Sequence, residues 1–119
     1  MAGSLASSLN HQPQFGITIS FDPSQPETAL LSMIGDFDID RVERLHETFE
    51  VIFETPCRHI VVNMAGVSFI DCANLRELCA ASEQARAIGA VFHVDGINPS
   101  TRHLIRLFGL NASLGVPPS

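Results

Sequence analysis

The pattern of hydrophobic and polar residues in the first half of the chain predicts two strands and a helix. Residues 15–21 alternate between apolar and small side chains, which is typical of a half-buried strand, and residues 28–34 predict a second strand. The Asp and prolines of residues 22–26 favour a chain reversal, so we expect an antiparallel hairpin with a longer loop. Apolar residues at helical spacing then predict a helix with one buried stripe: Ile39, Val42, Leu45, Phe49, Ile52 and Phe53.

The second half of the chain predicts two more strands and two more helices. Residues 60–65 are almost continuously apolar, as expected for a central strand that is buried on both faces. A helix is predicted from Cys72 to Ile88, and a fourth strand over residues 90–94. A last helix begins with Asn98 as N-cap and Pro99 as its first residue. Its expected hydrophobic anchors are Leu104, Ile105, Leu107, Phe108 and Leu110.

The predicted order of elements, β-β-α-β-α-β-α, indicates a single α/β domain. Two strand-helix-strand crossovers favour parallel pairing with right-handed connections. We therefore expect a mixed, mostly parallel sheet with helices packed on it. The domain is expected over residues 15–114, between a flexible N-terminal tail at residues 1–14 and a C-terminal tail at residues 115–119.

The composition narrows the class of protein. The formal net charge is −6, and all 7 basic residues are Arg, so a nucleic-acid partner is disfavoured. No apolar run reaches the roughly 18 residues that a membrane helix needs. The Ser-rich start of the chain lacks the basic residues and apolar stretch of a signal peptide. We expect a cytoplasmic protein that is not inserted into a membrane.

The sequence carries no pattern of an enzyme or of a metal site. It has no G-x-S-x-G, no glycine-rich phosphate loop and no C-x-x-C. No pair of His residues has the i, i+4 spacing of a helical metal site. Asp36, Asp38 and Asp40 alternate along the chain, but the Gly and Glu of a calcium-binding loop do not follow them. We therefore expect Asp38 or Asp40 to cap the first helix. Glu43, three residues after Asp40, would complete a capping box. We expect a non-enzymatic protein without metal or cofactor.

The most informative segment joins the third predicted strand to the second predicted helix. The strand passes through a short loop at residues 66–70, reaches Asp71 and leads directly into the helix at Cys72. A helix N-terminus presents free N–H groups and partial positive charge. Such a place suits an anion, a phosphoryl group or a thiolate. Asp71 would add a fixed negative charge and help to cap the helix.

The order of elements and five short segments resemble the STAS domain family, which is named for sulfate transporters and anti-sigma factor antagonists. Residues 67–75 match the family segment V-x-F-I-D-x-x-x-L. The other segments are Gly35-Asp36-Phe37-Asp38, similar to the family's Gly-Glu-Leu-Asp; Asn63-Met64-Ala65-Gly66-Val67, similar to its Asp-Leu-Ser-Gly-Val; and Ile97-Asn98-Pro99-Ser100 and Leu107-Phe108-Gly109-Leu110, similar to the start and end of its last helix. The resemblance covers residues 15–114 and implies a STAS-like fold.

The resemblance implies a protein-interaction module of the anti-sigma factor antagonist type. Family members of this size commonly bind an anti-sigma factor that is itself a protein serine kinase, and this binding releases a sigma factor. The family switch reads Asp-Ser-Ser-Gly-Leu, and phosphorylation of its first Ser ends the binding. Here the same positions read Asp71-Cys72-Ala73-Asn74-Leu75, so Cys72 stands at the phosphoacceptor position and cannot become a phosphoserine.

We expect a partner-binding surface around the start of the first helix and the strand-to-helix junction. Its predicted residues are Asp36, Asp38, Ser68, Asp71, Cys72, Ala73 and Asn74. The last three would supply small, exposed contacts, and binding would have no serine phosphoswitch.

Other interpretations of the junction remain open. Cys72 could be a redox-sensitive thiol, since a helix N-terminus favours the thiolate, although Asp71 opposes its ionisation. Binding could also be lost or retargeted. A different family role is that of a STAS subunit in a lipid-transport ABC system, which would co-purify with a transporter ATPase.

Overall fold

The computed structural model describes residues 15–117 and confirms the predicted order of strands and helices. The strands are β1 (Phe15–Asp22), β2 (Gln25–Phe37), β3 (His59–Ile70) and β4 (Val91–Asp95), and the helical elements are η1 (Ile39–Arg41, one 3-10 turn), α2 (Val42–Phe53), α3 (Cys72–Ala87), α4 (Pro99–Leu107) and the short, unexpected α5 (Asn111–Leu114). The tail predicted at residues 1–14 lies outside the described residues, as do residues 118–119. Val116, beyond the predicted domain boundary, is buried in the core.

The sheet is mixed and mostly parallel, as the sequence predicts. Its strand order is β1-β2-β3-β4; β1 pairs antiparallel with β2, and the other neighbours are parallel. The hairpin loop between β1 and β2 is shorter than expected, because Asp22 accepts hydrogen bonds from the backbone N and Oγ of Ser24 at 2.9 and 2.8 Å. These hydrogen bonds hold the pKa of Asp22 below its ordinary value.

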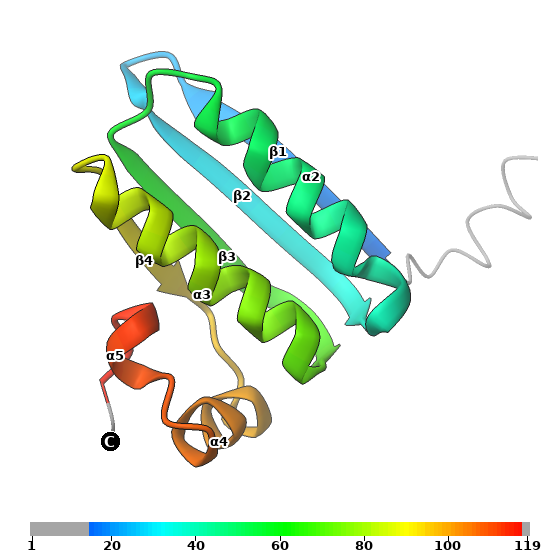
Figure 1. Cartoon of the computed structure of the whole chain (residues 1–119). Coiled ribbons are helices and arrows are strands. Elements are labelled where there is room, and N and C mark those ends of the chain that lie inside the picture. The colour runs from blue at the N-terminus through cyan, green and yellow to red at the C-terminus, as the bar shows by residue number, and fades with distance from the viewer. Residues whose placement is uncertain (1–14, 118–119) are drawn as a thin grey trace, which may run out of the picture.

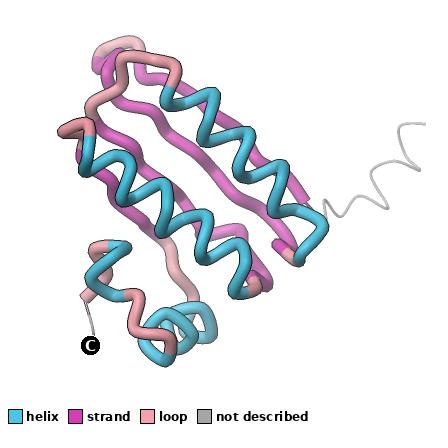
Figure 2. Tube along the Cα trace, in the orientation of Figure 1, coloured by secondary structure: helices cyan, strands magenta, loops and turns pink. Residues whose placement is uncertain are grey.

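The helices α2 and α3 lie side by side across one face of the sheet (Figure 1), with the strands behind them in a second layer (Figure 2). The core between the layers is apolar; its largest fully buried side chains include Leu31, Met33, Phe37, Leu45, Ile52, Ile60, Met64, Leu75 and Leu78. None of the helices among residues 15–117 is long and apolar enough to cross a membrane.

The expectation that the third strand is buried on both faces is wrong. Residues of β3 alternate between buried and more exposed positions, and Asn63 is exposed. On β2, Leu30 and Ile34 remain 39% and 40% exposed on the face away from the core. A strand with only one covered face shows this period of two. The apolar run at residues 60–65 did not reveal which face would be covered.

The strand β3 is also longer than predicted, because residues 66–70 continue it and form no loop. They pair with β2 as far as Phe37 opposite Ile70. The pairing shifts register next to Gly35, whose φ of 96° lies in a region that favours glycine. Both strands therefore reach the same end of the sheet, where the next helices begin.

Side chains at the helix starts hold the chain in place. Asp38 accepts a hydrogen bond from the backbone N of Asp40 at 3.1 Å and caps η1. The predicted capping box of Asp40 and Glu43 does not form, because α2 follows η1 directly and has no side-chain cap. Asn98 caps α4 through the backbone N of Thr101 at 2.8 Å, as expected. Its Nδ2 also donates to the carbonyl of Val67 at 3.1 Å, which ties α4 to β3.

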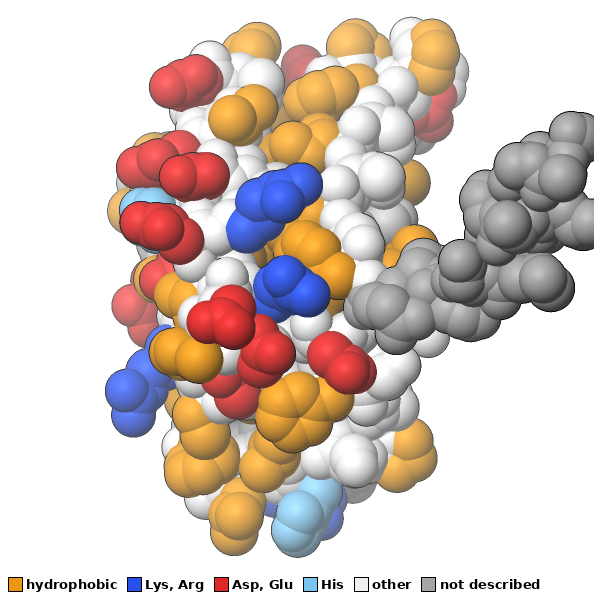
Figure 3. Space-filling model, turned by 90° about the vertical axis from the view of Figure 1, so that its right-hand side faces the viewer, with side chains coloured by type: hydrophobic (Ala, Val, Ile, Leu, Met, Phe, Trp, Pro, Cys, Tyr) orange, Lys and Arg blue, Asp and Glu red, His pale blue; other side chains and the backbone are white. Residues whose placement is uncertain are grey.

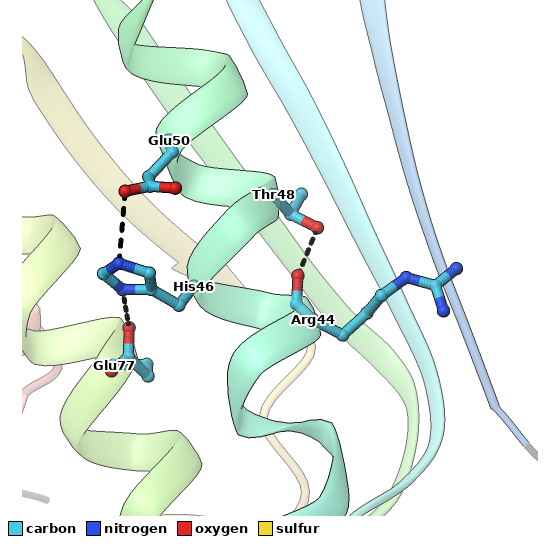
Figure 4. Close-up of polar contacts among 5 residues, drawn as sticks. All are labelled: Arg44, His46, Thr48, Glu50 and Glu77. Atoms are coloured by element: carbon cyan, nitrogen blue, oxygen red, sulfur yellow. Dashed lines mark hydrogen bonds and ion pairs between the residues drawn. The ribbon is translucent and has the colours of Figure 1, made fainter.

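A histidine bridges the two long helices. His46 on α2 lies between Glu50, one turn further along α2, and Glu77 on α3 (Figure 4). Its Nδ1 is 2.9 Å from Glu77 Oε1, and its Nε2 is 3.3 Å from Glu50 Oε2. The hydrogen bond to Glu77, together with the charges of both carboxylates, raises the pKa of His46 above its ordinary value.

Candidate functional site

The carboxyl ends of β2 and β3, the turn η1 and the N-terminus of α3 meet at one end of the molecule (Figure 1). This end carries all of the predicted partner-binding residues: Asp36, Asp38, Ser68, Asp71, Cys72, Ala73 and Asn74. The pairing of Asp36 with Phe69 places the first segment beside the second. Residues 36–38 and 68–74, far apart in the sequence, thus form one region.

Asp71 caps α3, as the sequence predicts. Its backbone is extended, and its Oδ1 accepts a hydrogen bond from the backbone N of Asn74 at 2.9 Å. The backbone N of Asp71 donates to the carbonyl of Phe37 at 3.0 Å. A carboxylate at this position offsets the partial positive charge of the helix start. It also remains partly exposed, so its charge is accessible from outside.

The expectation that Asn74 is an exposed contact is wrong. Asn74 is fully buried. Its Nδ2 lies within hydrogen-bond distance of the carbonyls of Phe37 at 3.0 Å and Asp38 at 2.8 Å, and of Asp71 Oδ1 at 2.9 Å. The third residue of α3 faces inward because the end of β2 packs against this turn of the helix. Asn74 therefore links the end of β2 to the start of α3 from the interior of the molecule.

Cys72 and Ala73 are half-buried, while Asp36, Asp38 and Ser68 are exposed. Cys72 lines a hollow of about 130 Å³ together with Arg76, Phe108 and Leu110. Ser68, predicted in a loop, lies in β3 and lines a neighbouring hollow with Phe69 and residues of α4. A larger hollow of about 500 Å³ lies at the other end of the sheet, around residues 24–28 and His59. The predicted residues are absent from its lining.

Large apolar side chains surround the region, and the sequence did not identify them as surface residues. Ile39 is 65% exposed, although its spacing placed it on the buried stripe of the first helix. It falls outside that stripe because η1 is a 3-10 turn that ends before α2 begins. Leu107 and Phe108, which were expected to anchor the last helix, are exposed. Phe69 is half exposed. A contiguous exposed apolar patch with polar residues at its rim is typical of a protein-binding surface.

The charges at this end are negative and accessible. Hydrophobic and acidic side chains lie next to one another at the lower end of the face in Figure 3. Among residues 15–117, no Arg lies within ion-pair distance of Asp36, Asp38 or Asp71. The guanidinium groups of Arg41 and Arg44 lie instead over the ring of Phe15, at 4.2 and 5.7 Å. In the described part of the chain, no three His, Cys, Asp or Glu residues group as a metal site.

The fold and the strand-to-helix junction define a STAS domain. The sequence pattern of the family described as "Mlab, STAS domain" matches residues 20–116, and the chain belongs to this family. The fold class and the family that the sequence indicates are thus confirmed.

Several solved structures are similar to this chain. An anti-sigma factor antagonist from Mycobacterium paratuberculosis has a TM-score of 0.76 at 20% identity, covering 88% of this chain and 86% of that one. The unphosphorylated anti-sigma factor antagonist SpoIIAA has a TM-score of 0.67 at 19% identity, covering 80% and 84%. A sulfate transporter family protein from Wolinella succinogenes has a TM-score of 0.65 at 22% identity, covering 81% and 75%. At these identities the comparison establishes the shared fold.

Proposed function

We propose that this chain is a non-enzymatic interaction module that binds an anti-sigma factor of the protein serine kinase type and thereby releases a sigma factor. One observation carries the proposal: Asp36, Asp38 and Asp71 lie at the same end of a STAS fold as the exposed side chains of Ile39 and Phe69. Accessible carboxylates next to apolar side chains suit a partner that offers basic groups around an apolar centre. We call the exposed residues 36, 38, 39, 68 and 69, together with the half-buried residues 71–73, the docking surface.

In this proposal the partner does not release the chain by phosphorylating residue 72. Cys72 is the first residue of α3, where the family motif has its phosphoacceptor Ser. A thiol is not a substrate for serine phosphorylation, and Ala73 offers no hydroxyl as a substitute. A complex with the kinase would therefore persist while ATP is present.

The experiment is incubation of the purified chain with an anti-sigma factor kinase from the same genome, with and without ATP. Size-exclusion chromatography reports the complex, and intact mass reports phosphate. We expect a complex of equal stability in both conditions and no phosphate on Cys72. Absence of a complex, or its loss on adding ATP, would contradict the proposal.

A matched pair of variants connects binding to the docking surface. Ile39→Ser removes an apolar side chain that is 65% exposed on the docking surface, and Ile88→Ser removes one that is 58% exposed just beyond the other end of α3. Both changes cost little stability, because neither side chain is buried. We expect Ile39→Ser to weaken binding at least tenfold and Ile88→Ser to leave it unchanged. Equal affinities would place the partner elsewhere.

A second candidate is a STAS subunit of a transport system, as in lipid-transport ABC systems. It is favoured by the family description, "Mlab, STAS domain", and by the structural likeness to a sulfate transporter family protein. Affinity purification of the tagged chain separates the candidates. A transporter ATPase recovered in equal amount, without a kinase, would favour this role.

A further inference from the structure

The buried side chain of Asn74 connects the two segments of the docking surface from the interior of the molecule. The first segment is the β2–η1 turn with Asp36 and Asp38, and the second is the start of α3 with Asp71 and Cys72. Asn74 belongs to the second segment, but its Nδ2 reaches the backbone carbonyls of Phe37 and Asp38 in the first, at 3.0 and 2.8 Å. We call this set of contacts the Asn74 bridge.

The orientation of the Asn74 amide follows from its neighbours. The three groups around Nδ2 are the carbonyl oxygens of Phe37 and Asp38 and the carboxylate oxygen of Asp71, and none of them can donate a hydrogen bond. With the amide rotated by half a turn, Oδ1 would face three oxygen atoms. The observed orientation is therefore the one in which the amide supplies its two N–H groups.

Within residues 15–117, one other hydrogen bond joins the β2–η1 turn to the start of α3. The backbone N of Asp71 donates to the carbonyl of Phe37, which also accepts from Asn74. The carbonyl of Asp38 accepts from the backbone N of Arg41 within η1 and from Asn74 across the two segments. Without the Asn74 side chain, both carbonyls would keep one partner each, so the fold would survive. The link between Asp38 and α3 would be lost.

We propose that Asn74 is a positioning residue that holds the docking surface in its binding-ready arrangement without touching the partner. This inference rests on the proposed function, since it concerns the same surface. A partner that meets a preordered surface does not have to order the turn during binding, and binding is tighter as a result.

The first test uses the chain alone and measures amide hydrogen exchange. Asn74→Ala removes the bridge, and Ala favours helix, so extra backbone freedom cannot explain a looser turn. Asn74→Asp keeps the size of the side chain and leaves at most one donor, the O–H of a protonated carboxyl. The reporters are the amides of Arg41 and Asp71, whose hydrogen bonds lie in the bridged region, measured relative to amides in the centre of β3.

The matched control is Ser82→Ala on the same helix. Ser82 is 4% exposed, and its Oγ donates to the carbonyl of Ser113 at 2.6 Å, so this variant also removes a buried hydrogen bond of α3. We expect the Arg41 and Asp71 amides to exchange at least tenfold faster, relative to the centre of β3, in the Asn74 variants that fold. In Ser82→Ala this ratio stays at its wild-type value. An unchanged ratio in Asn74→Ala overturns the inference, whatever the partner proves to be.

The second test measures affinity for the anti-sigma factor kinase described above. Asn74→Ala is expected to bind at least tenfold more weakly than Ser82→Ala. Equal affinities, together with faster local exchange, would overturn the positioning role while leaving the proposed function intact. If wild-type chain does not bind the kinase, the proposed function fails, and the exchange experiment still decides whether the bridge holds the turn.

Discussion

Substitution of Asp71 separates two contributions of one carboxylate. Its Oδ1 accepts hydrogen bonds from the backbone N and the Nδ2 of Asn74, both at 2.9 Å, and its negative charge lies at the start of the 16-residue helix α3. Asp71→Asn keeps an oxygen at Oδ1 and removes the charge. Asp71→Ala removes both the oxygen and the charge. The two variants should therefore differ in stability, and both should lose the charge that the docking surface presents.

The expected magnitudes follow from these contacts. Loss of an N-cap hydrogen bond costs about 0.5–2 kcal/mol, and loss of a favourable charge at a helix start costs about 0.3–1 kcal/mol. Asp71→Ala loses both, so we expect it to be destabilised by about 1–3 kcal/mol. The Nδ2 of Asn74 keeps its two carbonyl partners in this variant, so no further buried donor is left without an acceptor. Asp71→Asn should lose less than about 1 kcal/mol.

Urea unfolding followed by circular dichroism measures the difference. Thermal unfolding provides a second measurement, in which 1 kcal/mol corresponds to a shift of roughly 4–8 °C for a small domain. Asp71→Asn should unfold close to wild type and still bind the kinase more weakly. If both variants lose the same stability, the N-cap hydrogen bond of Asp71 contributes nothing to the free energy of unfolding, contrary to the expected magnitudes. If Asp71→Asn binds like wild type, its charge is not part of recognition.

Three further changes test the fold. Urea unfolding should show a larger loss of stability for Gly96→Ala than for Gly89→Ala. Both glycines have positive φ, but only at Gly96 would the added Cβ lie 2.7 Å from the backbone N of Ala65. Equal losses of stability in the two variants would contradict this close contact. Phe37→Ala should cost about 3–5 kcal/mol in the same assay, because the ring is fully buried; a loss below about 1 kcal/mol would contradict this packing. For His46, the raised pKa stabilises the fold below pH 6.5, and this stabilisation is lost as the pH rises through the folded-state value. The stability difference between wild type and His46→Asn should therefore shrink from mildly acidic to mildly alkaline pH, and a constant difference would contradict the bridge to Glu77.

Local chemistry predicted the starts of α3 and α4 well. Asp71 and Asn98 act as N-caps, and Pro99 is the first residue of α4, as the sequence indicates. Each of these roles depends on a side chain and a backbone group within three residues of each other, so the sequence contains the whole interaction. The order of strands and helices along the chain followed from hydrophobic periodicity.

The errors concern what each element packs against. The sequence placed Asn74 near the start of a helix but did not show that the end of β2 would cover it, and this contact spans 36 residues or more. Ile39 fits the helical stripe by spacing, yet the turn η1 lies outside α2. The burial of β3 on one face depends on where α2 and α3 lie, which its own residues do not determine. Packing between distant segments decided the burial of Asn74 and of β3, whereas the 3-10 turn η1 decided the exposure of Ile39.

The most direct test of the docking surface is hydrogen exchange of the complex between this chain and the anti-sigma factor kinase. Comparison with the free chain gives the peptides that the partner covers. We predict slower exchange in residues 36–41 and 68–76, with little change in the C-terminal half of α2. Slower exchange confined to the uncovered face of the sheet, with residues 36–41 and 68–76 unaffected, would contradict the account.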